Sequence, residues 1–142
     1  MVACTSKSPS GTIGAMQKRV DAVERQVETL YNQDFDYLVR EYQALDTTVA
    51  LTKDIQNEME LLQAYLQQFE IQKDELKEGV AFSRKQLSDL QDDINNNLYD
   101  EETTSQYIQD EEQELRMMEA QIKYFQEKFD AQKKVVKQLR KE

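Results

Sequence analysis

The sequence predicts an all-α protein, specifically an elongated antiparallel coiled-coil hairpin with a long first helix. Residues that break helices are scarce, since the 142 residues of the chain include 3 Gly and 1 Pro. Apolar residues recur at steps of three and four along most of the chain, as on one face of a helix. Charged residues make up 32% of the chain, too many for a compact globule, which would bury roughly two-thirds of its unfolded surface. An elongated helical shape is therefore expected.

The first helix is predicted to start near Ile13, where the helical spacing of apolar residues begins. Its seam, the row of apolar positions on one helix face, continues to Val49. Two successive steps of four fall in "YNQDFD" (31–36). Such a stutter predicts a local change of supercoil rather than a helix end. The seam positions are Ile13, Met16, Val20, Val23, Val27, Tyr31, Phe35, Leu38, Tyr42, Leu45 and Val49.

A second stretch continues the pattern, and Lys73 and Ser83 occupy two of its seam positions. The connector "DTTVALTKD" (46–54) has no Gly, Pro or Asn, so the sequence favours one continuous helix through it. The alternative is a second turn near 46–54, which would make a three-helix up-down-up bundle. The apolar seam residues are Ile55, Met59, Leu62, Leu66, Phe69, Leu76, Val80, Leu87, Leu90 and Ile94.

A turn is predicted near 95–104, within "DINNNLYDEETTS" (93–105). Three consecutive Asn disfavour a helix interior. Asp100, followed by Glu101 and Glu102, fits an N-cap with acidic residues in the first helical turn. One helix therefore ends here and another begins.

The last helix carries a regular heptad that Glu111 and Gln132 interrupt. Its end is rich in Lys and Arg, as suits a helix C-terminus. The apolar seam residues are Ile108, Leu115, Met118, Ile122, Phe125, Phe129, Val136 and Leu139, and the basic residues at the end are Lys133, Lys134, Lys137, Arg140 and Lys141.

Folding the last helix back on the preceding one gives a testable register. A turn centred at about residue 99 places Phe129 opposite Phe69 in an antiparallel pair. The same register brings the basic end near Asp54, Glu58 and Glu60, and the acidic run 110–114 near Arg84 and Lys85. If the first helix is continuous, its N-terminal half leaves an apolar stripe uncovered. A second chain would then cover it, so a homodimer is one expectation.

The composition also narrows the function. A formal net charge of -10 argues against nucleic-acid binding, which needs clustered Lys and Arg. The absence of His removes the usual general base near neutral pH, and there is no Gly-rich phosphate loop. We therefore expect no enzymatic activity, no cofactor, no metal and no small-molecule substrate.

Three acidic clusters, "LQDDI", "YDEE" and "QDEEQE", offer several carboxylates, the ligands that Ca²⁺ prefers. None has the D-x-[DN]-x-[DN]-G form of a calcium-binding loop. They are interpreted as solvated helix faces. The 7 Tyr and 5 Phe fall mostly at or near seam positions, which favours packing over base stacking.

The N-terminus carries the most specific functional signal. Residues 5–12, "TSKSPSGT", are small and polar and contain the single Pro, as is typical of a flexible linker. Before them, Met1, Val2, Ala3 and Cys4 resemble the lipobox of bacterial lipoproteins, with Met at its first position. In the lipobox a branched apolar residue, a small or apolar residue, and then Gly, Ala or Ser precede the cysteine. The resemblance implies lipidation of Cys4, cleavage just before it, and a start upstream of Met1 that supplies the signal peptide.

The sequence thus divides into a lipobox remnant (1–4), a linker (5–12) and one helical coiled-coil domain (13–142). The favoured function is a non-catalytic, lipid-anchored protein of the bacterial cell envelope that acts as a spacer, scaffold or docking surface. Protein partners would bind through helix packing, and the lipid on Cys4 would anchor the protein in the membrane. Alternatives are a cytoplasmic coiled-coil scaffold and, less favoured, a holdase chaperone.

Overall fold

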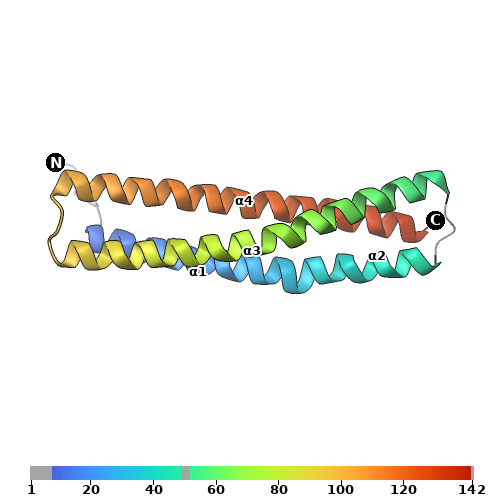
Figure 1. The fold of residues 1–142 in the computed structure, drawn as a ribbon, viewed down its shortest axis with the longest axis horizontal. Coiled ribbons are helices and arrows are strands. Elements are labelled where there is room, and N and C mark those ends of the chain that lie inside the picture. Colours follow the sequence, from blue (N-terminus) through green and yellow to red (C-terminus); the bar gives the residue numbers. More distant parts are fainter. Residues whose placement is uncertain (1–7, 49–51, 142) are drawn as a thin grey trace, which may run out of the picture.

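The computed structural model describes residues 8–48 and 52–141, and the predicted all-α class is confirmed. Within these ranges every regular element is helical. The elements are α1 (Pro9–Thr29), the π-helix η1 (Leu30–Phe35), α2 (Asp36–Thr48), α3 (Lys53–Asn95) and α4 (Glu101–Lys141). They pack as an elongated helical bundle (Figure 1).

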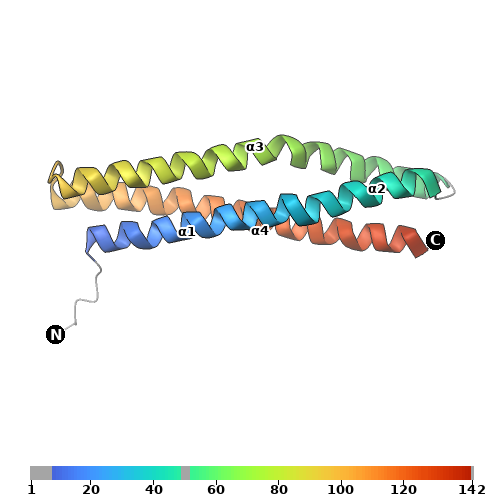
Figure 2. The same cartoon turned by 90° about the horizontal axis from the view of Figure 1, so that it is seen from below.

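α1, η1 and α2 follow one another as a single helical column, which we call the first column. This column contacts both α3 and α4 along its length. It runs antiparallel to α3 and parallel to α4 (Figures 1 and 2). The start of α1 and the α3–α4 turn therefore lie at one end of the bundle, and the ends of α2 and α4 lie at the other.

Side-chain caps define where the helices begin. Ser8 accepts a hydrogen bond from the Gly11 amide, and Pro9 occupies the first turn of α1, where its missing N–H costs nothing. Residues 9–12, which the sequence assigns to the linker, are therefore helical. Thr52 caps α3 by accepting from the Ile55 amide. Of the segment 46–54, where the alternative second turn is placed, α2 includes residues 46–48 and α3 starts at Lys53. Residues 49–51 lie outside the described residues.

The turn between α3 and α4 follows the sequence prediction. α3 ends at Asn95, and Asn97 adopts a left-handed backbone with φ 55°, a conformation that Asn tolerates better than most residues. The Asp100 carboxylate accepts a hydrogen bond of 2.7 Å from the Thr103 amide. The predicted N-cap is therefore confirmed.

The stutter at 31–36 coincides with the π-helix. A π-helix carries more residues per turn than an α-helix, so successive steps of four keep facing the same side. Leu30 and Tyr31 are both buried there, at 1% and 2% exposed, and Phe35 follows at 8%. The chain stays helical through the stutter, as predicted. The predicted local change of supercoil corresponds to the wider turn of the π-helix.

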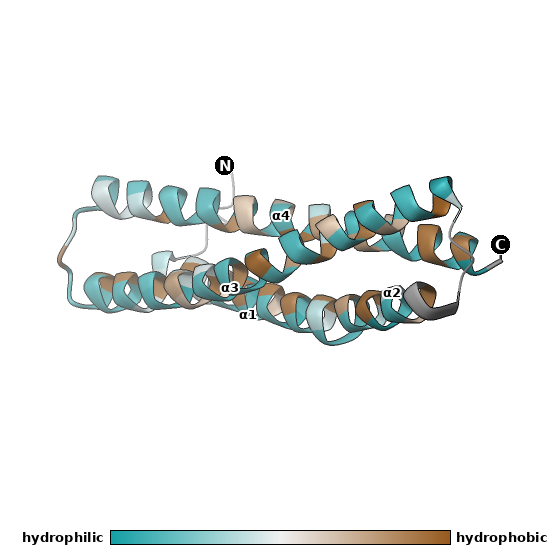
Figure 3. Ribbon diagram, turned by 45° about the vertical axis from the view of Figure 1, so that its right-hand side comes forward, coloured by the Kyte–Doolittle hydropathy of each residue, from teal (hydrophilic) through white to brown (hydrophobic). Residues whose placement is uncertain are grey.

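The core is a continuous apolar seam along the bundle axis (Figure 3). At its centre the Phe69 and Phe129 rings have centroids 4.4 Å apart, which confirms the predicted register of α3 and α4. Tyr31 packs edge-on against Phe129 from the first column, with centroids 6.0 Å apart. Aromatic residues from the first column, α3 and α4 thus form one cluster, which fixes how these three parts are aligned along the bundle axis.

The predicted register does place Asp54 and Glu58 beside Leu139 of α4. The ion pairs of Arg84, Lys133 and Arg140 nevertheless form with the first column, and not between α3 and α4. Arg84 of α3 binds Asp21, at 2.8 Å, and Glu24. At the basic end of α4, Lys133 binds Asp34 and Arg140 binds Glu41, the latter at 2.9 Å. A register of α3 against α4 does not include the first column, which supplies the carboxylates of these ion pairs.

Tyr31 gives a test of the central packing. Its buried hydroxyl donates a 2.8 Å hydrogen bond to the Phe69 backbone carbonyl, and burial raises the pKa of this phenol to about 12. We expect Tyr31→Phe to lower the free energy of unfolding by about 0.5–1.5 kcal/mol, measured by urea denaturation. Tyr124→Phe, on an exposed side chain, is the control and should change little.

Candidate functional site

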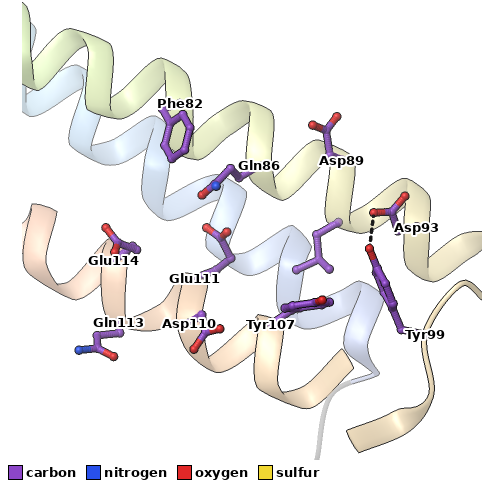
Figure 4. A pocket seen from close by; sticks show the side chains of 11 residues that line it. Phe82, Gln86, Asp89, Asp93, Tyr99, Tyr107, Asp110, Glu111, Gln113 and Glu114 are labelled. Carbon is purple, nitrogen blue, oxygen red and sulfur yellow. Dashed lines mark hydrogen bonds between the residues drawn. The ribbon is translucent and has the colours of Figure 1, made fainter. Parts of the chain in front are cut away.

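A groove of about 650 Å³ lies between α3 and α4, close to the turn that joins them (Figure 4). We call it the α3/α4 groove. α3 and α4 each supply a row of side chains, and Tyr99 closes the end next to the turn. The lining residues are Phe82, Gln86, Asp89, Leu90, Asp93, Tyr99, Tyr107, Asp110, Glu111, Gln113 and Glu114.

The groove lies where the seam is interrupted. Glu111 occupies a position of the α4 heptad that would otherwise be apolar, and a carboxylate does not pack tightly against an apolar helix face. On α3 the seam residue Ser83, 7% exposed, has a small side chain that fills little space. These polar or small seam residues weaken the contact between α3 and α4 in this half of the bundle.

A second hollow of about 400 Å³ extends the groove away from the turn. It shares Phe82 and Glu114 with the first and adds Gly79 and Met117. Phe82 is 61% exposed and Met117 is 60% exposed. The combined surface therefore has exposed apolar side chains beside a row of carboxylates.

The groove carboxylates repel one another. Burial, and then the charges of Glu114 and Asp110, raise the pKa of Glu111. The Tyr99 hydroxyl donates a 3.2 Å hydrogen bond to Asp93, and this bond raises the pKa of Tyr99. Within the described part of the chain, no ion pair neutralises Glu111 or Glu114.

The adjacent face of α4, which meets α1, shows the opposite arrangement. Arg19 of α1 donates hydrogen bonds to both Glu112 and Glu119, and Arg116 donates to Glu112 at 2.9 Å. Burial raises the pKa of Glu112, but the bonds from the two arginines outweigh it and the pKa is lowered. Carboxylates of α4 are thus neutralised toward α1 and left open toward the groove.

The structure brings together side chains from all three acidic clusters noted in the sequence. Asp93 comes from "LQDDI", Tyr99 from "YDEE" and Asp110 from "QDEEQE". Glu111 is partly buried, as is Asp93, whereas Asp110 is exposed. Among the described residues, no group of carboxylates converges closely enough to hold a metal ion.

Glu111 also gives a stability prediction. A raised carboxyl pKa means that the folded state disfavours the charged form, so stability falls as pH rises through that pKa. We expect Glu111→Gln to raise the free energy of unfolding by up to about 1 kcal/mol near pH 7 and by less near pH 4. Urea denaturation at both pH values measures this. Glu127→Gln, on an exposed residue of the same helix, should have little effect.

Glu111 is visible in the sequence as a break in the heptad, but the sequence pattern alone does not indicate a groove. Phe82, Tyr107 and Met117 were missed because they lie off the seam. A usable signal was present, since these apolar residues flank the two polar or small seam positions Ser83 and Glu111.

The predicted lipidation site, Cys4, lies outside the described residues, as does the whole of Met1–Cys4. Among the described helices, none contains a segment that is both long enough and apolar enough to span a bilayer. Comparisons with protein-family models, curated proteins and solved structures found no match.

Proposed function

We propose that this protein is a non-catalytic helical bundle of the bacterial cell envelope, anchored by lipid on Cys4, that binds another protein in the α3/α4 groove. The observation that carries the docking role is the groove itself, in which Phe82 and Met117 are exposed. Beside them lie Glu111 and Glu114, two carboxylates that make no ion pair with any described residue. Exposed apolar side chains gathered in a groove are typical of sites for protein partners. The anchor is supported by the lipobox-like sequence around Cys4.

We further propose that the chain is a monomeric three-helix up-down-up bundle, rather than a hairpin with a protruding first helix. The cap at Thr52 supports a helix start at Lys53. Contacts of the first column with both α3 and α4 support an apolar stripe that is covered within one chain. Light scattering should give the mass of one chain, and a stable dimer would contradict this.

The anchor and the groove would lie at the same end of the bundle. The Gln91 side-chain amide of α3 donates a 2.6 Å hydrogen bond to Ser10, so the start of α1 lies beside the last turns of α3. Lipid on Cys4 would therefore hold the groove in the half of the bundle nearer the membrane. A partner bound there would be close to the bilayer surface.

The anchor is tested by the intact mass of the N-terminal peptide of the protein isolated from its own cells. We expect acylated Cys4 as the first residue. An unmodified peptide that starts at Met1 or Val2 would contradict the anchor and favour the alternative of a cytoplasmic scaffold. In that case deletion of residues 1–12 should leave the location of the protein unchanged.

The docking role is tested separately by photo-crosslinking in the native cells. A photoreactive phenylalanine analogue at position 82 should give a discrete protein adduct. The same analogue at Ile71, which is 67% exposed on the same helix and outside the groove, is the control. Equal adducts at both positions, or none at position 82, would contradict docking in the groove.

A further inference from the structure

We infer that the partner in the α3/α4 groove is a basic amphipathic helix of about four turns, bound by its apolar face and flanked by Lys or Arg. The inference depends on the proposed docking role and specifies the chemistry of the partner. It follows from the length, the apolar content and the charge of the groove.

The length of the groove matches a short helix. Its lining extends from Gly79 to Asp93 on α3 and from Tyr107 to Gln121 on α4. At ~1.5 Å per residue, each wall is roughly 20 Å long, which equals about four turns of helix. A helix laid in this position would be a fourth member of the bundle, packed where the seam of α3 and α4 is interrupted.

The apolar content of the groove selects an amphipathic partner. Phe82, Tyr107 and Met117 are 61%, 40% and 60% exposed. The Tyr107 ring is held edge-on against Tyr99, with centroids 4.9 Å apart. An incoming helix that places apolar residues at steps of three and four would cover these side chains.

The charge of the groove selects a basic partner. Its lining includes the carboxylates of Asp89, Asp93, Asp110, Glu111 and Glu114, and no Lys or Arg is among the described residues that line it. Lys85 does approach Asp89, at 3.5 Å on the outer face, which leaves the other four without an ion pair among the described residues. The carboxylates are spread along the groove rather than gathered around one point, so they suit a row of cations better than a single metal ion.

The same charges disfavour the other occupants. A second copy of the chain would bring a net charge of -10 and an identical acidic groove against the first, which is repulsive. An anionic lipid headgroup would be repelled for the same reason. A helix flanked by Lys or Arg would instead be attracted, and its binding would weaken with salt.

The test uses three designed helical peptides with one apolar stripe and with polar faces of Lys, Gln or Glu. Fluorescence anisotropy with the full chain measures their affinities. Several exposed ion pairs together should make the Lys peptide bind roughly tenfold more tightly than the Gln peptide, and salt should remove this advantage. The Glu peptide should bind least.

Two matched sets of variants locate the binding. Asp89→Asn, Asp110→Asn and Glu114→Gln together should abolish the advantage of the Lys peptide. A control variant carries the same change of charge at exposed positions outside the groove and should keep the advantage of the Lys peptide. Its substitutions are Glu60→Gln, Asp74→Asn and Asp130→Asn. Phe82→Ala should weaken all three peptides, whereas Ile71→Ala should not.

The outcomes separate this inference from the docking role. A Gln peptide that binds the groove as tightly as the Lys peptide would overturn the basic partner and leave docking intact. Equal losses in both triple variants would assign the binding to overall charge and overturn the inference. If no peptide binds, the inference fails, and the photo-crosslink at position 82 still decides whether a protein docks there. If the chain self-associates and Phe82→Ala abolishes this, the occupant of the groove is a second copy of the chain, and the inference of a basic partner is overturned.

Discussion

Replacing Val20 with aspartate is expected to abolish cooperative folding of the whole chain. Val20 is 0% exposed in the core of α1, and an unpaired carboxylate buried at an apolar position should cost more than about 4 kcal/mol. Natural domains are typically stable by about 5–15 kcal/mol, so most of the stability would be lost. Circular dichroism during urea denaturation measures the effect.

The same variant distinguishes the two proposed architectures. In a three-helix monomer, helix signal should be lost from α3 and α4 together with α1, because all three columns share one core. In a hairpin with a protruding first helix, α3 and α4 would stay folded and only part of the helix signal would disappear. Gln26→Asp introduces the same charge at an exposed position of α1 and should leave folding intact.

Replacing Phe129 with alanine is expected to lower the free energy of unfolding by about 3–5 kcal/mol. The ring is 0% exposed and contacts Tyr31, Phe35 and Phe69 from two other columns. Tyr31 and Phe35 lie in η1 and Phe69 lies in α3, so closing the cavity left by the ring would require two packed helical segments to shift.

Urea denaturation followed by circular dichroism measures the effect of Phe129→Ala. Phe82→Ala is the matched control, because this phenylalanine is 61% exposed and its loss should change stability by less than about 1 kcal/mol. Similar losses in both variants would contradict the central role of the aromatic cluster.

Seam spacing predicted much of this fold because it depends on local periodicity. The positions of Phe69 and Phe129, and the cap at Asp100, follow from residues close in the sequence or from one helix pair. The partners of Arg19 and Arg84 could not be predicted in this way. Each depends on how a third helical column is placed, and long, exposed charged side chains do not select a unique neighbour.

The candidate site was predictable only in part. Glu111 was recognisable as a break in the heptad, but a carboxylate that faces a neighbouring helix can equally be compensated by an ion pair, as Glu112, next to the seam, is by Arg19. Whether such a break opens a groove depends on the facing helix. Ser83 is readable from the sequence, but its position relative to Glu111 is a property of the packed bundle.

The start of α1 and the end of α4 lie at opposite ends of the bundle, so the proposed lipid anchor would set how far the end of α4 lies from the membrane. α3 has 43 residues and is about 65 Å long at ~1.5 Å per residue. In a chain held by lipid on Cys4 and standing upright, the Lys-rich end of α4 would therefore be several Debye lengths from the bilayer, since one such length is about 8–10 Å in physiological salt. Those lysines would be too far away to sense anionic headgroups, and would face whatever lies deeper in the compartment.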